Sequence, residues 1–226
     1  MVKIVFTPDW FLGKDILVGF FSFIVLVILS VLAVKGYKLK KNKSLLSLGT
    51  GFGLIALAQL ASIFTKLVLY YESAPVRAIG RAIITSQIVS SIDIFYYAGF
   101  FCYSFLTLMG LFTIYKIPQK KIYAGDYVII AYFAVLSSLL SGKFFYLFHI
   151  TAFLLLVLVI SNYLKIYREN KFMNTRILII SFSILAFSQL VYILSKIGVF
   201  FALSNIMELI SYTILLFLII RIIKHG

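Results

Sequence analysis

Five polar side chains lie within long apolar stretches of the 226-residue chain: Gln59, Tyr103, His149, Gln189 and Glu208. An ionisable group inside a membrane-spanning helix commonly costs about 2.5–3.5 kcal/mol on insertion scales, so its presence needs a physical reason. Glutamine offers paired donor and acceptor groups without net charge, whereas Glu208 could attract a cation or carry a proton. Together these residue types suit a binding site for a small polar or cationic substrate.

The five residues are expected at similar depths in their helices. Counting about 1.5 Å per residue from the basic end of each run places Gln189 and Glu208 roughly 20 Å deep, and Gln59 slightly deeper. Tyr103 and Ser22 fall near that level, and His149 and Tyr192 lie a little farther out. In the alternative interpretation, Gln59 and Gln189 form interhelical hydrogen bonds that only hold the bundle together. Glu208 would then be neutralised by Lys196 or by protonation.

Catalytic and metal-binding patterns do not accompany these residues. The sequence has two histidines and one cysteine, Cys102, with no CxxC, HExxH, GxSxG or GxxxxGK[ST] motif. The sequence therefore predicts a protein that is not an enzyme and that has no catalytic residues, cofactor or metal.

The composition is that of a membrane protein. Hydrophobic residues make up 63% of the chain and charged residues 12%, against about 45–50% and about 25% in soluble domains. The net charge of +14 comes from short basic clusters between apolar runs. Such clusters anchor helix ends and form no nucleic-acid-binding domain, so we expect the lipid bilayer as partner and no nucleic acid.

The positions of the apolar runs predict a single all-α membrane domain, residues 1–226, with seven transmembrane helices. A hydrocarbon core about 30 Å thick requires roughly 20 helical residues. The runs cover residues 14–35, 45–70, 91–115, 126–141, 144–165, 176–197 and 200–221. Residues 77–90 fit either an interfacial helix or an early start of the third span. Gly49, Gly51 and Gly53 open the second run and would allow close approach of a neighbouring helix.

The distribution of Lys and Arg predicts the orientation. Fourteen of these residues fall on the side that includes Lys35–Lys43 and Lys165–Arg176, and seven fall on the other side. By the positive-inside rule, the C-terminus is cytoplasmic, the N-terminus is outside, and the protein lies in the cell membrane. Lys66 and Lys196 fall at outer helix ends, where their long side chains are expected to reach the headgroups.

An internal repeat appears when the chain is shifted against itself by 130 residues. The matched residues include Lys35 with Lys165, Tyr37 with Tyr167, Lys41 with Lys171, Phe52 with Phe182, Ala56 with Ala186 and Gln59 with Gln189. The matches in the second run recur every three or four residues and so share one helix face. Pairing Asp93 and Tyr97 with Glu208 and Tyr212 requires a different shift. We therefore expect two parallel three-helix units, about 14–115 and 144–221, joined by a linking helix at about 126–141.

In this arrangement the chain resembles the seven-helix 3+1+3 proteins, which include SWEET-type sugar transporters, microbial opsins and their relatives. The resemblance implies an N-terminus outside and a C-terminus inside. It covers the whole chain in topology, whereas the proline–glutamine motif of the former and the retinal lysine of the latter are absent from the predicted spans.

Two functions are consistent with these observations. The first is a small-molecule or ion transporter with its site between the two units. The alternative is a non-enzymatic receptor, sensor or structural subunit that acts through its cytoplasmic basic loops on a partner protein or as a homo-oligomer.

Overall fold

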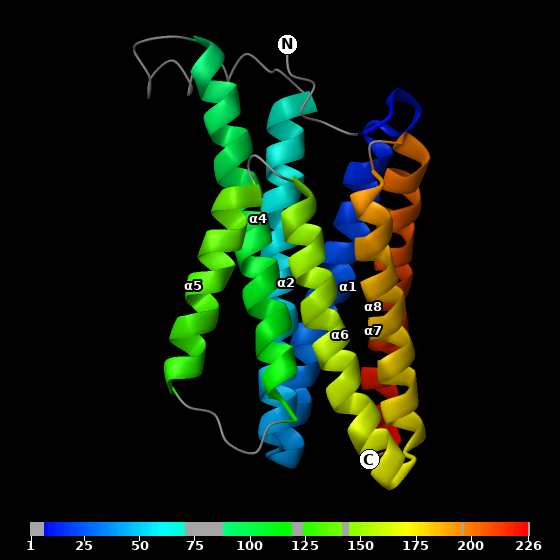
Figure 1. Ribbon diagram of the computed structural model, residues 1–226. Coiled ribbons are helices and arrows are strands. Elements are labelled where there is room, and N and C mark those ends of the chain that lie inside the picture. The colour runs from blue at the N-terminus through cyan, green and yellow to red at the C-terminus, as the bar shows by residue number, and fades with distance from the viewer. Residues whose placement is uncertain (1–6, 71–87, 119–123, 142–144, 196, 226) are drawn as a thin grey trace.

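The computed structural model describes residues 7–70, 88–118, 124–141, 145–195 and 197–225. A short 3-10 helix, η1 (Asp9–Phe11), precedes the α-helices. Over the described residues these helices number seven: α1 (Lys14–Lys40), α2 (Lys43–Tyr70), α4 (Ile88–Lys116), α5 (Ala124–Ser141), α6 (Phe145–Asn170), α7 (Met173–Ile193) and α8 (Gly198–His225). They lie side by side as one bundle (Figure 1). The prediction of an all-helical protein is confirmed.

Six of these helices contain stretches long and apolar enough to cross a membrane. The stretches are Lys14–Leu39, Lys43–Val68, Tyr96–Tyr115, Phe145–Asn170, Met173–Ile193 and Gly198–Lys224. The helix α5, predicted to be the shortest span, has an apolar part at Ala131–Leu140. A seventh crossing therefore stays a prediction.

Most helices extend beyond their predicted runs by a few residues, whereas α7 ends earlier than predicted. The helix α7 ends at Ile193, four residues before the end of its apolar run, because the amides of Leu194 and Ser195 bond to carbonyls three residues back in a tighter turn. Hydropathy does not report this turn, since the residues that form it are also mostly apolar. In the ambiguous segment 77–90, residues 88–90 belong to α4, and the remainder lies outside the described residues.

The six long helices close a ring. In order around the ring, α1 packs on α2, α2 on α4, α4 on α6, α6 on α7, α7 on α8, and α8 returns to α1. The helix α5 lies outside this ring and packs on α4 and α6 (Figure 1). The start of α1 and the end of α8 lie at opposite ends of the bundle.

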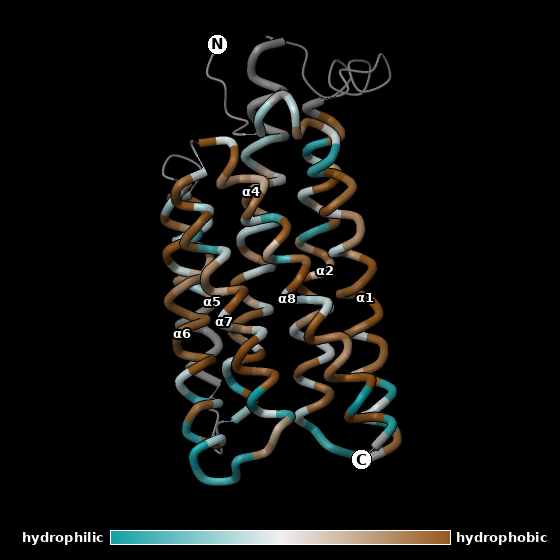
Figure 2. Tube along the Cα trace, turned by 90° about the vertical axis from the view of Figure 1, so that its right-hand side faces the viewer, coloured by the Kyte–Doolittle hydropathy of each residue, from teal (hydrophilic) through white to brown (hydrophobic). Residues whose placement is uncertain are grey.

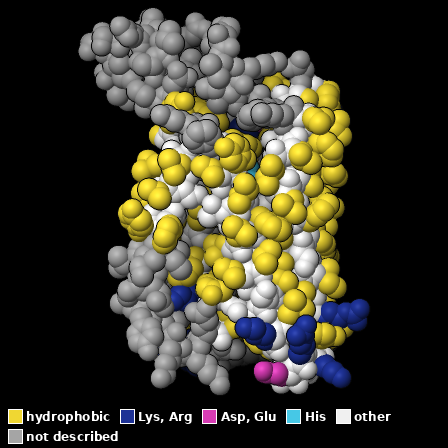
Figure 3. Space-filling view, in the orientation of Figure 1, with side chains coloured by type: hydrophobic (Ala, Val, Ile, Leu, Met, Phe, Trp, Pro, Cys, Tyr) yellow, Lys and Arg dark blue, Asp and Glu magenta, His cyan; other side chains and the backbone are white. Residues whose placement is uncertain are grey.

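The bundle is apolar on its outside and partly polar within. Large side chains such as Leu17, Phe64, Phe187 and Phe217 are exposed, and apolar side chains cover most of the described flank in Figure 3. Hydrophilic residues gather in the turns at the lower end (Figure 2). The interior is mainly apolar but also buries several polar residues: Ser22, Gln59, Ser104, His149, Gln189 and Glu208. This polarity suits lipid as the surrounding solvent.

The helices α2 and α4 approach each other closely at two glycines. A Cβ built on Gly51 would lie 3.0 Å from the carbonyl oxygen of Gly110, and one built on Gly110 would lie 2.7 Å from that of Gly51. Only glycine permits backbones this near each other. The close approach predicted from the glycines of the second run thus occurs at this crossing.

The two turns at the lower end have matching caps. Lys41 directly follows α1, and Lys171 directly follows α6. Both residues adopt the left-handed conformation, with φ of 54° and 51°. Their amides donate to the carbonyl oxygens of Tyr37, at 2.7 Å, and Tyr167, at 2.8 Å. Lysine adopts this conformation at some energetic cost, so the two caps are a specific local feature.

Candidate functional site

Glu208 on α8 lies at the centre of a buried hydrogen-bond cluster. Its Oε1 accepts from Gln59 Nε2 on α2 at 2.8 Å and from the Tyr212 hydroxyl at 2.7 Å. Its Oε2 accepts from the Tyr192 hydroxyl on α7 at 3.3 Å. All four side chains are buried. Tyr212 follows Glu208 by one helical turn, so the other two contacts are the ones that join different helices.

A second buried pair adjoins this cluster. His149 Nδ1 on α6 lies 2.8 Å from Gln189 Oε1 on α7. An amide oxygen only accepts hydrogen bonds, so Nδ1 carries the hydrogen in this contact. The imidazole stacks on the ring of Tyr192, with centroids 4.7 Å apart and planes 18° from parallel. Tyr192 therefore links the His149–Gln189 pair to Glu208.

Tyr103 lies on α4, which is opposite α8 in the ring of helices, and it borders the same region. Its aromatic ring packs against Phe148 at 5.3 Å and Phe100 at 6.3 Å, and Phe148 in turn contacts His149. Unlike the members of the Glu208 cluster, Tyr103 is only half-buried.

The structure thus brings the five sequence-predicted site residues into one region of the bundle. Gln59 and Gln189 do not bond to each other; each bonds across helices to a different titratable partner, Glu208 for Gln59 and His149 for Gln189. Lys196, the predicted counter-ion of Glu208, lies outside the described residues.

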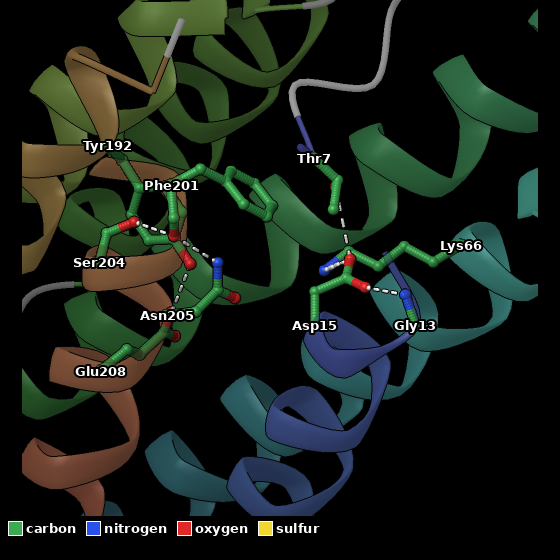
Figure 4. Close-up of polar contacts among 9 residues, drawn as sticks. All are labelled: Thr7, Gly13, Asp15, Lys66, Tyr192, Phe201, Ser204, Asn205 and Glu208. Atoms are coloured by element: carbon green, nitrogen blue, oxygen red, sulfur yellow. Dashed lines mark hydrogen bonds and ion pairs between the residues drawn. The ribbon is translucent and has the colours of Figure 1, made fainter. Parts of the chain in front are cut away.

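An ion pair joins the start of α1 to α2 at the upper end of the bundle in Figure 1. Lys66 Nζ, near the end of α2, is 3.1 Å from Asp15 Oδ2 at the start of α1, and the Asp15 side chain is 0% exposed. Asp15 Oδ1 accepts from the Gly13 amide at 3.1 Å, and Oδ2 accepts from the Thr7 hydroxyl at 3.5 Å (Figure 4). Lys66 is thus bound to a buried carboxylate while its own side chain stays 22% exposed, and its expected reach to the headgroups stays a prediction.

Phe201 connects this ion pair to the Glu208 cluster. Lys66 Nζ lies 5.6 Å from the centre of the Phe201 ring, a cation–π distance, and Phe201 contacts Tyr192 edge to face at 6.0 Å. Figure 4 shows the ion pair and the Tyr192–Glu208 contacts on either side of this ring. Lys66 also attracts Glu208 electrostatically. The ion pair and Glu208 thus form one connected polar region.

Two buried polar atoms on the helices that supply these residues have no hydrogen-bond partner within the described part of the chain: His149 Nε2 on α6 and Thr107 Oγ1 on α4, one turn after Tyr103. A buried polar group left without a partner costs on the order of 1–3 kcal/mol. Polar groups of a ligand or of water could supply the missing bonds.

The sequence prediction missed three residues of this region: Asp15, Tyr212 and Thr107. Asp15 stands at a helix start, where an acid needs no partner to be explained. Tyr212 carried a detectable signal, because it lies four residues after Glu208 on the same helix face. Thr107 has no signal in one sequence, since threonine is common in apolar helices.

The arrangement is chemically suited to bind a cation, a proton or a polar solute. It offers a carboxylate, neutral donors and aromatic faces, while the described residues contain no group of three His, Cys, Asp or Glu side chains able to hold a metal ion. No family model matches the chain, and no curated protein or solved structure matches it either. What the site does must therefore be inferred from its own residues.

Proposed function

We propose that this chain is a multi-pass membrane transporter for a small polar or cationic solute, which binds between two three-helix units. The observation that carries the proposal is the bond from Gln59 on α2 to the buried carboxylate of Glu208 on α8. It joins the two units at mid-bundle through polar groups whose burial is costly. Purely structural contacts would be satisfied more cheaply by apolar packing.

The packing of the helices supports two equivalent units, α1–α2–α4 and α6–α7–α8. In each unit the first helix packs on the second and the second on the third. Between the units, α1 packs on α8 and α4 packs on α6, which are the pairings that a two-fold exchange of the units would interconvert. The caps at Lys41 and Lys171, 130 residues apart, support the same relation.

The third helix of each unit is α4 or α8. Their contacts favour an alignment of these two helices that differs from the pairing of Asp93 with Glu208. Gly51 packs against the Gly110 carbonyl, and the carbonyl of Ser181, the counterpart of Gly51, accepts from Ser211 Oγ at 2.8 Å. Gly110 and Ser211 differ by 101 residues. In that register Thr107, with its unpartnered hydroxyl, is the counterpart of Glu208. Each unit would then contribute one buried polar group on its third helix.

The orientation that we propose has the lower end of Figure 1 in the cytoplasm. Exposed Lys and Arg side chains gather at this end (Figure 3), which contains the turns at Lys41 and Lys171. Transport in this geometry requires the two units to rock about the α1–α8 and α4–α6 contacts. The Asp15–Lys66 ion pair would lie toward the outside.

Flux into proteoliposomes tests the proposal. We expect uptake of at least one probe among rubidium, methylammonium, a neutral sugar and a neutral amino acid. We also expect at least a tenfold loss of that flux in Glu208→Gln, equivalent to about 1.4 kcal/mol, because the substitution keeps the shape and removes the charge. Glu169→Gln, at an exposed residue near the end of α6, is the matched control. Flux that survives Glu208→Gln would remove this residue from the mechanism, and no flux of any probe would count against transport.

A receptor that signals through its cytoplasmic turns is the second candidate. Phe172 and Met173, which follow Lys171, are 61% and 53% exposed. Exposed apolar residues beside basic ones are typical of a surface that docks on a partner or on lipid headgroups. A pull-down in which Phe172→Ser and Lys171→Ser lose a partner that the wild type retains would favour this function.

A further inference from the structure

The two oxygens of Glu208 have unequal surroundings. Oε1 accepts two short bonds, from Gln59 at 2.8 Å and from Tyr212 at 2.7 Å. Oε2 has one long contact, 3.3 Å to the Tyr192 hydroxyl. The two tyrosine hydroxyls can either donate or accept, whereas the Gln59 amide nitrogen only donates. Oε1 must keep its lone pairs for the Gln59 donor, so Oε2, which contacts only the Tyr192 hydroxyl, is the oxygen that can carry a proton without losing a bond.

Counted over the described residues, the charges of the region do not balance. It buries two carboxylates, Asp15 and Glu208, and the ammonium that lies between them, Lys66, contacts Asp15 at 3.1 Å. Within the described part of the chain, the hydrogen-bond partners of Glu208 are the neutral side chains of Gln59, Tyr192 and Tyr212. A buried carboxylate without a contacting cation is costly, and neutralisation by a proton relieves that cost.

Building on the proposed transport function, we infer that the proton is the coupling ion and that Glu208 Oε2 carries it. In the loaded state Glu208 is a carboxylic acid whose hydroxyl at Oε2 donates to the Tyr192 oxygen. In the unloaded state the proton has left to water on one side of the membrane, and the carboxylate accepts from the Tyr192 hydroxyl. One proton binds and one is released in each cycle, with no other bond made or broken.

Titratable or charged groups surround Glu208 on several helices. Lys66 on α2 and Asp15 on α1 form their ion pair on the far side of the Phe201 ring. Tyr103 on α4, Tyr192 on α7 and Tyr212 on α8 supply hydroxyls, and His149 on α6 stacks on Tyr192.

Infrared spectroscopy of the protein in lipid tests this assignment without knowledge of the solute. We expect a protonated-carboxyl C=O band at neutral pH that shifts on exchange into D2O and disappears in Glu208→Gln. In Tyr192→Phe the band should persist and move to higher frequency, because the acid loses its hydrogen-bond acceptor. This variant also keeps the test usable if Glu208→Gln does not fold. Glu169→Gln should leave the band unchanged.

Each outcome decides the inference separately from transport. A wild-type spectrum with no such band from mildly acidic to neutral pH would overturn it, because Glu208 would then be a permanent anion. A band that disappears in Asp15→Asn and persists in Glu208→Gln would overturn it too. Glu208-dependent rubidium flux without the band would leave the transport proposal standing and refute proton coupling. A protonated-carboxyl band from Glu208 without flux of any probe would leave the protonation of Glu208 standing and count against the transport proposal.

Discussion

At the scale of single residues, the polar interior depends on side chains that are far apart in the sequence. Gln59 and Glu208 are separated by 149 residues, yet they form the contact that joins α2 to α8. Hydrogen bonds between membrane helices average about 0.6 kcal/mol, and those to a charged group in water-soluble proteins reach about 1.5–3 kcal/mol. The Gln59–Glu208 bond should lie between these values.

A double-mutant cycle measures this bond. Gln59→Leu and Glu208→Leu should each lower the free energy of unfolding in mixed micelles. Together they should lower it by less than the sum, with a coupling of about 0.5–2 kcal/mol. The cycle Gln189→Leu with Glu208→Leu is the control, since Gln189 bonds to His149 instead. Equal coupling in both cycles would contradict a specific Gln59–Glu208 contact.

The site could be predicted in part at this scale. The cost of burying Gln59, Gln189 and Glu208 in apolar runs identified them from the sequence, and the structure places them in one region. Their partners could not be predicted, because the contact of Lys66 with Asp15, or of Gln189 with His149, depends on how helices rotate about their axes. The rotation of each helix about its axis could not be predicted from one sequence.

At the scale of helices, the Asp15–Lys66 pair fastens the start of α1 to the end of α2. Asp15→Asn leaves a 22% exposed ammonium without its carboxylate. The loss of stability should fall between the roughly 1 kcal/mol of an exposed pair and the roughly 3–5 kcal/mol of a fully buried pair. The double variant Asp15→Asn/Lys66→Met should recover part of that loss in thermal unfolding. A double variant less stable than Asp15→Asn alone would show that the pairing is not what matters.

The crossing of α2 and α4 gives a second prediction at this scale. Gly110→Ala would place a Cβ 2.7 Å from the Gly51 carbonyl oxygen, so the helices must separate. We expect a loss of about 1–3 kcal/mol, as for overpacking of a core. Gly53→Ala is the control, because its Cβ would meet the side chain of Ser30 at 3.1 Å, which can rotate. Similar unfolding temperatures for the two variants would contradict the close crossing.

At the scale of the whole molecule, the hydropathy pattern predicted the helices because lipid permits few other structures. An apolar run of about 20 residues satisfies its backbone polar groups only as a helix. The ends of the helices were less predictable: α8 continues to His225, past the apolar run that ends at 221, because helix formation does not require apolar residues at a membrane surface. The closed order of helices around the ring was likewise beyond the sequence.

The central claim is that Gln59, Gln189 and Glu208 line a site that water and solute reach, and are not only interhelical contacts. Cysteine accessibility tests it most directly, in a Cys102→Ser background that removes the one native, exposed thiol. We expect Gln59→Cys and Gln189→Cys to react with a small membrane-impermeant thiol reagent in intact proteoliposomes. Leu26→Cys, in the apolar core, should not react. If the two glutamine positions are as unreactive as Leu26, the cluster is a sealed structural core and the transport account is wrong.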